Sequence, residues 1–571
     1  MTRFPRAATL AVALFACNGD KTTTTDTGLT VSDTDTDTDA DADTDTDADT
    51  DTDTDTTTTF TPTPVVRDAR FDAVVATLEA ELGDNLAAGA SIAVLEQGQF
   101  TWVEGFGTAV PGQNVPMTPD HILQIGSTTK QMTAATVLRE VDAGLFSLDD
   151  PMSALLPQFS LALSPDWTAQ ATPHLLLSHQ GGLYDLIVAS NPPIDSDLAD
   201  FYYDVYGPNL WAMSPPGAFW NYANPNFSLA GLVAEVHDPG GRYWPDIVEQ
   251  DVFAPLGMTS TYARKAEVLG VGRYAESVGV DVTTYNVGPV AMADVPDPAS
   301  DRPAGFVWST PSDMARWGAF VLHGNPAVLP DALREQMITP QVSTGYYGDH
   351  YSYGYGEMIW DLYPLSDGFH PLHVIEHGGN TLSFTSVLVM LPDQDVVLSL
   401  LSTGYGDDWS DTTEAVLRAV VDPFPAVSPY TGEPFDPAQI GDHVGTYLDE
   451  HNVGDIIVTA GGANGLQISM PVLDQYGYGV DPDLVPASTD LWFVMIDGVA
   501  YDLTFIGDPP QYVRNRVFVG TRVDGTTTTT DTAADTGARL AGPPTPSPDE
   551  VARALRAWRA PSPIKLPAPR R

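Results

Sequence analysis

The chain has 571 residues, of which 43% are hydrophobic, and carries a formal net charge of -51. A chain of this size and apolar content can bury a large core and is expected to form about two domains. Such a negative charge argues against a general nucleic-acid or acidic-membrane binder, because those surfaces are usually basic. We therefore expect a small-molecule or peptide substrate and no nucleic acid.

The first residues are typical of an export signal. MTRFPRAATLAVALFA carries two arginines and then an apolar run that is too short to span a membrane. Cys17 follows and is the only cysteine, so no internal disulfide can form. Its position resembles the lipobox of bacterial lipoproteins, which implies cleavage before Cys17 and lipidation of its thiol. The alternative is a secreted protein with an incidental cysteine, but we expect a lipid anchor at the bacterial cell envelope, periplasmic or on the cell surface.

Low-complexity segments are predicted at both ends of the chain. Residues 18–64 contain a long Thr/Asp alternation that cannot bury apolar surface, so a disordered linker is expected. This run lacks the glycine and glutamate of an EF-hand loop, so no defined calcium site is predicted. Residues 525–571 form a basic, Pro-rich tail that is also predicted to be disordered. Between them, the composition predicts two domains, 65–430 and 436–524.

The segment QIGSTTKQMT places Lys130 three residues after Ser127, at the predicted start of an amphipathic helix. Ser127 alone is explained as an N-cap. Lys130 is not, because a cation in the first turn faces the positive end of the helix dipole. The chain has only four lysines, and a buried lysine, unlike arginine, can lose its proton. Since residues three apart on a helix are neighbours, Lys130 is predicted to activate the Ser127 hydroxyl.

Two further segments offer partners for an activated serine. PPGAFWNYANPNFSLAGLVAEV carries Tyr222 and Asn224 just before an apolar helical pattern, where they suit proton transfer and an amide contact to Lys130 or a substrate carbonyl. Aromatic packing and helix capping are the structural alternatives for this pair. HVIEHGGNTLSFTSVLVMLPDQDVVLSLL is predicted to form two strands joined by PDQD. The first of these strands carries His377, Gly378, Gly379 and Asn380.

Glycines within a strand indicate close approach of another backbone. The amide of Asn380 is therefore predicted to complete an oxyanion hole together with the amide of Ser127. A β-bulge is the structural alternative for Gly378 and Gly379.

Taken in order, GSTTK, YAN and HGG resemble the three motifs of the serine β-lactamase and DD-peptidase superfamily, in its class C and esterase-like branch. The resemblance also includes PHLLLSHQGGLYD, PAGFVWSTPSDMARW and YGYGEMIW. It implies an α/β (α+β) fold, in which a mostly antiparallel sheet is flanked by helices and accompanied by a helical subdomain. The serine is expected at the junction of these two parts.

The resemblance also implies roles for the motif residues. Ser127 is the acylated nucleophile, Lys130 is its proton acceptor or relay, and Tyr222 shares the acid–base work. Asn224 helps to hold the substrate amide, and Gly379 and Asn380 lie beside the acyl carbonyl. His377 stands where related β-lactamases carry a lysine.

His377 is expected to be mostly neutral near pH 7, so the site attracts a substrate carboxylate less than a lysine would. No class A glutamate motif is present to activate water, so deacylation is expected to use Tyr222 and Lys130. We therefore predict a serine hydrolase that forms an acyl-enzyme on a peptide, amide or ester, without a cofactor. It would be D-Ala-D-Ala carboxypeptidase-like, an esterase or β-lactamase-related. The alternative is an inactive cell-surface binding scaffold, against which the joint presence of Ser127, Lys130 and Tyr222 argues.

The sequence does not favour two other chemistries. HPLHVIEH gathers potential zinc ligands, but in an extended segment its histidines reach a single ion poorly, so no metal is predicted. An α/β-hydrolase is not indicated, because the chain has no G-x-S-x-G motif.

The second domain, 436–524, consists of short alternating runs broken by Gly, Asp and Pro, which predict a small β-barrel or sandwich. It is similar to the lipocalin-like C-terminal domains of some superfamily members.

Overall fold

The computed structural model describes residues 61–281 and 286–523. The predicted export signal, Cys17, all but residues 61–64 of the predicted linker, and the C-terminal tail lie outside these ranges. Both major sheets of the protein belong to one compact unit, so the domain boundaries at 430 and 436 stay predictions. No helix in the described ranges has the length and apolar character needed to cross a bilayer.

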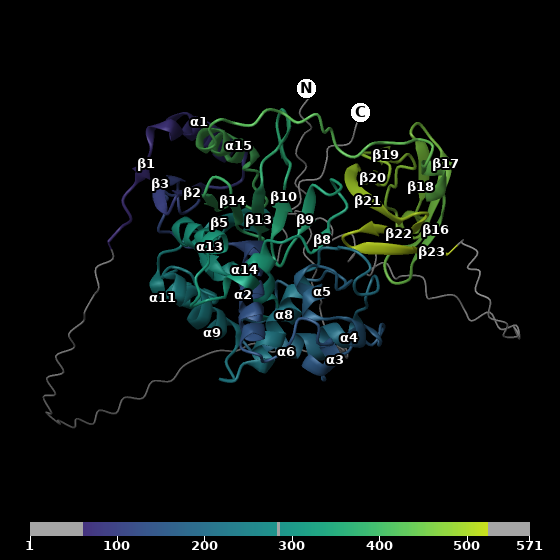
Figure 1. Ribbon diagram of the computed structural model, residues 1–571, viewed down its shortest axis with the longest axis horizontal. Helices are drawn as coiled ribbons and strands as arrows, with labels where there is room; N and C mark the ends of the chain where they lie inside the picture. The colour runs from purple at the N-terminus through teal and green to yellow at the C-terminus, as the bar shows by residue number, and fades with distance from the viewer. Residues whose placement is uncertain (1–60, 282–285, 524–571) are drawn as a thin grey trace, which may run out of the picture. The chain divides into compact units, whose positions relative to one another are not determined.

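The larger sheet is antiparallel throughout and has nine strands (Figure 1). Their order across the sheet is β1-β3-β2-β15-β14-β13-β10-β9-β8. In chain order they are β1 Val66–Arg67, β2 Gly89–Glu96, β3 Gln99–Gly107, β8 Val342–Ser343, β9 Tyr351–Tyr353, β10 Met358–Trp360, β13 Val374–Asn380, β14 Thr385–Leu391 and β15 Val396–Ser402.

The sequence predicted two strands in HVIEHGGNTLSFTSVLVMLPDQDVVLSLL. The structure has three strands there, so that prediction was wrong. β13 ends at Asn380, and a tight turn leads into β14 before PDQD leads into β15. The Thr381 hydroxyl accepts hydrogen bonds from the amides of Ser383 and Phe384, at 3.3 and 3.0 Å. This side-chain turn contains no Gly or Pro and was hidden in a run of residues that suit strands.

Helices lie against both faces of the sheet. On one face α1 (Asp72–Asp84) packs against α15 (Ser410–Val420), and the two are drawn together in Figure 1. On the other face α13 (Pro311–His323) packs against β15 and β2. This contact is close, because a Cβ atom on Gly318 would lie 2.4 Å from Cγ1 of Val397.

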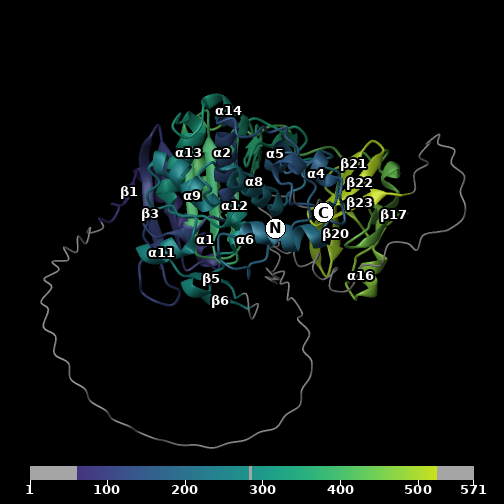
Figure 2. The same ribbon diagram turned by 90° about the horizontal axis from the view of Figure 1, so that it is seen from below.

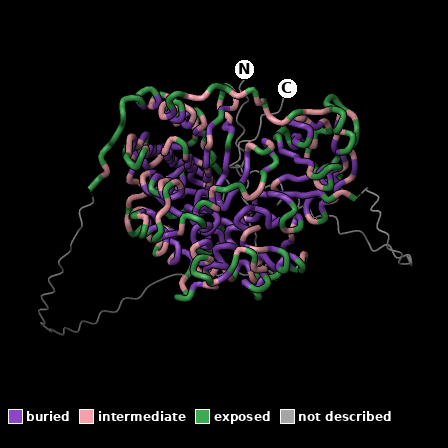
Figure 3. Tube along the Cα trace, in the orientation of Figure 1, coloured by how far each residue is buried: buried purple, intermediate pink, exposed green. Residues whose placement is uncertain are grey.

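A helical region surrounds α2 (Thr129–Asp142), which packs against α8 (Asn224–His237) and α12 (Arg302–Gly305) (Figure 2). The predicted helix after Ser127 is thus confirmed. Its burial is not one-sided, however, because every residue from Thr129 to Leu138 is buried. Figure 3 shows that the buried parts of the chain gather in the interior of the folded region. The buried threonines are tolerated because their hydroxyls donate hydrogen bonds to backbone carbonyl oxygens. Thr133 donates to the carbonyl oxygen of Pro303 at 2.6 Å, and Thr136 donates to that of Met132 at 2.8 Å.

The remaining elements are short. The other helices are α3 Met152–Leu155, α4 Trp167–Gln170, α5 Pro173–Leu177, α6 Asp197–Asp200, α7 Gly207–Asn209, α9 Trp244–Val248, α10 Ala254–Leu256, α11 Lys265–Val271, α14 Asp331–Met337 and α16 Pro471–Gln475. Three two-stranded pairs are β4 Leu123–Gln124 with β7 Trp308–Ser309, β5 Ser277–Val280 with β6 Val287–Val290, and β11 Tyr363–Leu365 with β12 Gly368–His370.

The C-terminal part is an eight-stranded antiparallel sheet in the order β18-β17-β16-β23-β22-β21-β20-β19. Its two ends meet, because Ile468 donates a backbone hydrogen bond to Pro482 at 2.8 Å and Leu484 donates one to Leu466 at 3.2 Å. The curled sheet encloses its own apolar core around Trp492. The strands are β16 Gly445–Asp449, β17 Gly454–Gly461, β18 Gly465–Ser469, β19 Val485–Pro486, β20 Leu491–Ile496, β21 Val499–Gly507, β22 Pro510–Asn515 and β23 Phe518–Arg522.

Replacing Gly318 by Ala is expected to destabilise the protein by about 1–3 kcal/mol, because the new methyl overpacks the contact between α13 and β15. Val397→Ala in the same chain is expected to relieve the clash, so the double variant loses less than the sum of the single losses. Urea unfolding of the native chain, the two single variants and the double variant measures this coupling.

Gly270→Ala on α11 is the matched control, since a Cβ atom there has no neighbour within 4 Å. That variant is expected to be unchanged or up to about 1 kcal/mol more stable. Equal losses at the two glycines would contradict the close helix–sheet contact.

Candidate active site

Ser127 lies in a short 3-10 turn, Gly126–Thr128, directly before α2. Its side chain does not cap the helix, so the N-cap interpretation is not what the structure shows. The turn is tied to the sheet, because Ser386 on β14 donates to the carbonyl of Ile125 at 2.7 Å and its hydroxyl lies 2.8 Å from that of Thr128. Ser127 is half-buried, whereas its neighbours in the turn are buried. The serine is therefore rigidly held and still open to a substrate.

Lys130 meets Ser127 as predicted. Its Nζ lies 3.1 Å from Ser127 Oγ, 2.7 Å from Asn224 Oδ1 and 2.5 Å from the carbonyl oxygen of Ala304. The side chain is fully buried, and this burial lowers the pKa of the Lys130 ammonium well below its usual value.

These contacts suit the uncharged amine. A neutral amine has two N–H donors and one lone pair. Asn224 Oδ1 and the Ala304 carbonyl oxygen can only accept, so they take the two donors and leave the lone pair for the Ser127 hydroxyl. The geometry therefore matches an amine that is ready to receive the serine proton.

Tyr222 lies beside this pair, in the loop before α8. Its ring centroid is 5.0 Å from Lys130 Nζ and 4.1 Å from the ring centroid of His179. Burial raises the pKa of the Tyr222 phenol, while the Arg516 charge and the nearby Ser127 side chain partly oppose that rise. No described residue makes a well-formed hydrogen bond to its hydroxyl. Tyr222 therefore stays protonated near neutral pH, next to Ser127.

β13 brings the HGGN segment against the serine turn. A Cβ atom on Gly379 would lie 1.9 Å from the carbonyl oxygen of Ile125, so only glycine permits this approach. Gly126, at φ 54°, faces the same strand, and a Cβ atom there would lie 2.5 Å from the amide nitrogen of Asn380. The Asn380 amide is thus close to Ser127, as an oxyanion hole requires. The Asn380 side chain instead accepts a hydrogen bond from Thr385, at 2.9 Å.

His377 is fully buried on β13 and is held by groups of the protein itself. Its Nδ1 lies 2.7 Å from the carbonyl oxygen of Gly378, and its Nε2 lies 3.3 Å from the hydroxyl of Tyr353. The carbonyl can only accept, so Nδ1 carries the proton and Nε2 accepts one from Tyr353. Burial is the largest cause that lowers the pKa of His377, to about 3. The histidine is therefore neutral near pH 7, as expected from the sequence.

Sequence reasoning missed three residues of this site. Asp185 accepts hydrogen bonds from the backbone and side-chain amides of Asn224, at 2.8 and 3.0 Å. His179, at φ 56°, accepts a hydrogen bond from the Ala223 amide at 3.3 Å and packs against Tyr222. Arg516, from the C-terminal sheet, pairs with Asp185 at 2.6 Å. The segment PHLLLSHQGGLYD contains His179 and Asp185, but nothing in the sequence connects Arg516 to it.

Three of the four potential metal ligands of HPLHVIEH, namely His370, Glu376 and His377, have separate partners. His370 contacts Asp367, and Glu376 accepts hydrogen bonds from Trp360 and Tyr363, at 2.9 and 2.8 Å. Across residues 61–281 and 286–523 no group of three or more His, Cys, Asp or Glu side chains is arranged to hold a metal ion.

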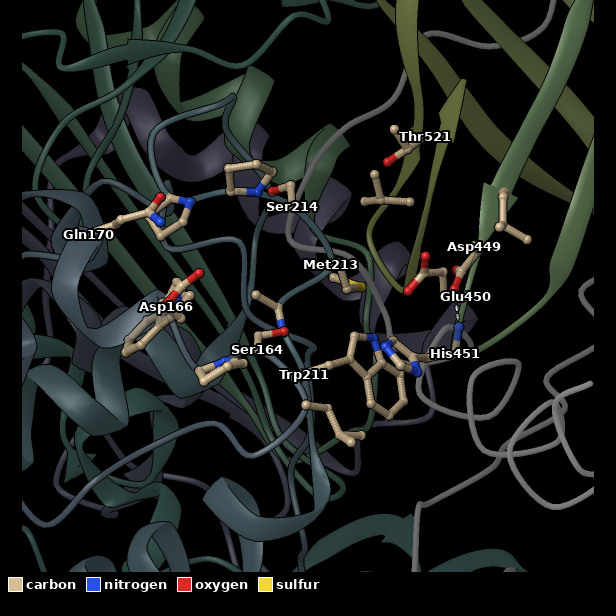
Figure 4. Close-up of a pocket in the computed structure, with 18 of the residues that line it drawn as sticks. Ser164, Asp166, Gln170, Trp211, Met213, Ser214, Asp449, Glu450, His451 and Thr521 are labelled. Atoms are coloured by element: carbon tan, nitrogen blue, oxygen red, sulfur yellow. Dashed lines mark hydrogen bonds between the residues drawn. The ribbon is translucent and has the colours of Figure 1, made fainter. Parts of the chain in front are cut away.

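A separate pocket of about 470 Å³ lies between residues 163–167, residues 211–216 and the strands β16 and β23 (Figure 4). The Trp211 and His451 rings face each other across 4.8 Å on one side, and Asp166 and Gln170 line the other. Ser127, Lys130 and Tyr222 are not among its lining residues, so this pocket is distinct from the serine site.

An antiparallel sheet flanked by helices, with a serine turn and an S-x-x-K lysine at the start of a buried helix, defines the class of serine β-lactamases and DD-peptidases. The family model described as Beta-lactamase matches residues 72–422. The chain belongs to this family.

Curated relatives are similar at low identity. An unguisins hydrolase from Aspergillus campestris is 26% identical over 57% of this chain and 60% of its own length. Penicillin-binding protein 4 from Amycolatopsis lactamdurans is 27% identical over 55% of this chain and 81% of its own. The esterase EstB from Burkholderia gladioli is 27% identical over 51% and 80%. The chain thus spans less than two thirds of the Aspergillus protein and about four fifths of the other two.

Among solved structures, the crystal structure of SurE is similar over 80% of this chain and 99% of SurE, with a TM-score of 0.59 and 22% identity. At this identity the likeness concerns the fold alone. It agrees with the architecture expected from the three motifs.

Gly379→Ala is expected to destabilise the protein by about 1–3 kcal/mol, because its methyl group would collide with the Ile125 backbone. Gly378→Ala on the same strand is the control, since its nearest neighbour would be the Ser386 carbonyl oxygen at an ordinary 3.7 Å. Urea unfolding of the two variants measures the difference. Equal stabilities would contradict the close approach of β13 to the serine turn.

Proposed function

We propose that this protein is a serine hydrolase that acts through an acyl-enzyme on a peptide, amide or ester substrate. The observation that carries the proposal is the 3.1 Å contact between Ser127 Oγ and the buried amine of Lys130, whose pKa lies well below its usual value. Ser127 Oγ attacks the carbonyl carbon, its proton passes to Nζ, and the carbonyl oxygen becomes an oxyanion. The amides of Ser127 and Asn380 then donate to this oxyanion.

Collapse of the tetrahedral adduct expels an amine or an alcohol, which needs a proton. Tyr222 supplies it in this proposal and recovers a proton from the Lys130 ammonium, because burial keeps its phenol protonated. Water then attacks the acyl carbon and gives its proton to the same pair. The products are the free acid and the restored Ser127 hydroxyl.

The substrate we propose is a peptide-like amide, such as a D-Ala-D-Ala stem peptide, or a simple ester, ahead of a β-lactam. The neutral state of His377 supports the simple ester and an amide without a free carboxylate, because an uncharged imidazole attracts a substrate carboxylate less than a lysine would. The esterase among the relatives supports the ester class.

An inactive binding scaffold is the second candidate, and the site argues against it. A scaffold has no need for a lysine that is fully buried, has its pKa lowered and lies beside a half-exposed serine. Burying such a group costs stability, which catalysis repays and binding alone does not.

Intact-protein mass spectrometry after exposure to a fluorophosphonate tests the enzyme proposal. One adduct is expected on the native chain and none on Ser127→Ala. Lys130→Arg is expected to label about 100- to 10,000-fold more slowly, because an arginine cannot accept the serine proton. Native labelling is expected well below pH 10.5, since the lowered pKa keeps Lys130 unprotonated there.

Penicillin provides the substrate arm of this experiment. A persistent penicilloyl adduct supports a peptidase, and rapid turnover supports a β-lactamase. If folded native protein reacts with neither probe, the scaffold replaces the hydrolase.

We also propose export and lipid anchoring at the cell envelope, on the strength of Cys17 directly after an apolar signal. In a bacterial host the native chain is expected in the membrane fraction, with a mass that corresponds to cleavage before Cys17 plus acyl chains. Cys17→Ser is expected to leave the membrane fraction. An unchanged distribution of that variant would contradict the anchor.

A further inference from the structure

The turn between β22 and β23 brings the C-terminal sheet to the serine site. Arg514 donates hydrogen bonds to the carbonyl oxygens of Trp220 and Thr344, and Asn221 donates to the carbonyl oxygen of Arg516 at 3.4 Å. The turn thus contacts the two residues that precede Tyr222. The Arg516 guanidinium lies 4.7 Å from the Tyr222 ring centroid, a distance at which a cation and an aromatic ring attract.

From Arg516 a chain of polar contacts runs to the nucleophile. Arg516 Nε donates to Asp185 Oδ2 at 2.7 Å, and Asp185 Oδ1 accepts from Asn224 Nδ2 at 3.0 Å. Asn224 Oδ1 lies 2.7 Å from Lys130 Nζ, which in turn contacts Ser127. All five side chains are buried or half-buried.

We propose that the C-terminal β domain completes the active site, with Arg516 as a positioning residue that holds Asn224, and through it Lys130, by way of Asp185. This inference rests on the proposed serine-hydrolase function.

The orientation of the Asn224 amide explains why Asp185 is needed. An amide group can turn over and present either its oxygen or its nitrogen to Lys130. A carboxylate only accepts, so Asp185 binds the Nδ2 side and leaves Oδ1 for Lys130. With the amide turned over, Nδ2 would compete with Ser127 for the lone pair of the amine.

Arg516 in turn stabilises Asp185 in this role. The Asp185 side chain is 5% exposed, and a buried carboxylate without a cation is costly. Arg516 Nε and an Nη both lie within 2.7 Å of Asp185 Oδ2, and the planar guanidinium approaches the carboxylate in a fixed orientation. Removing Arg516 therefore loosens the orientation of Asn224 as well as the pair itself.

The same two residues have opposite effects on the proton affinity of Lys130. Burial lowers the pKa of Lys130 most; the Asp185 charge opposes this by raising the pKa, whereas the Arg516 charge lowers it further. The titratable groups that face Lys130 are Asp185, Asp301, Arg516, His179, His377 and Tyr222. In the pH dependence of the rate, the acid limb is the fall in rate at low pH, where Lys130 becomes protonated. Loss of Arg516 must therefore shift this acid limb to higher pH, and loss of the Asp185 charge must shift it to lower pH.

The test is the second-order rate of fluorophosphonate labelling of the full chain, measured from pH 5 to pH 10. Arg516→Gln is expected to label about 10- to 100-fold more slowly at neutral pH, with its acid limb moved to higher pH. Arg516→Lys keeps the charge, so it is expected to recover the acid limb and part of the rate. Asp185→Asn is expected to move the acid limb to lower pH.

Arg522→Gln is the matched control. Arg522 belongs to the same sheet and donates to the carbonyl oxygens of Asp442 and Pro510, at 2.8 and 3.1 Å, and neither of these residues belongs to the chain of contacts that leads to Ser127. Its variant is expected to keep the native rate and acid limb.

Native rate and acid limb in folded Arg516→Gln would overturn the inference and leave the hydrolase proposal intact. If that variant does not fold, an unmoved acid limb in Asp185→Asn overturns it instead. Absence of labelling in the native chain is a different result, because it removes the proposed function on which the inference rests.

Discussion

The site depends on one constraint, the burial of an amine that must remain uncharged. Lys130 is surrounded by α2, α8 and α12, and water does not compete for its lone pair. Desolvation lowers its pKa more than any neighbouring charge does. Two fixed acceptors then take its N–H groups, so that the lone pair points to Ser127. The packing of α2, α8 and α12 therefore both excludes water from this amine and fixes its orientation.

The large sheet provides the second half of the site. β13 passes against the serine turn, and glycine at positions 126 and 379 lets two backbones approach more closely than any side chain would permit. Hydrogen bonds between Ser386 on β14 and the serine turn hold Ser127 in position beside the sheet. The nucleophile, which belongs to a helix start, and the Asn380 amide, which belongs to a strand, are thus held together by backbone packing.

The C-terminal sheet supplies a cation to the candidate active site. Asp185 is buried and requires a cation, and among the described residues its ion pair is with Arg516. Arg516 meets that requirement from a β-turn of the second sheet, and its guanidinium also lies over Tyr222. The C-terminal sheet, which has its own apolar core, therefore contacts the helical region through polar groups of the candidate active site.

The sequence by itself determined the local chemistry. Ser127 and Lys130 are one helical turn apart, so backbone geometry alone brings them together, and the order of YAN and HGGN indicated the sheet, the helical region and the remaining motif residues. Even the neutrality of His377 followed from its residue type. The turn at Thr381 escaped because a side chain makes it, without Gly or Pro. Only the tertiary structure decided that Asp185, His179 and Arg516 meet at Asn224 and Tyr222, because a contact across 331 residues leaves no periodicity or spacing in the sequence.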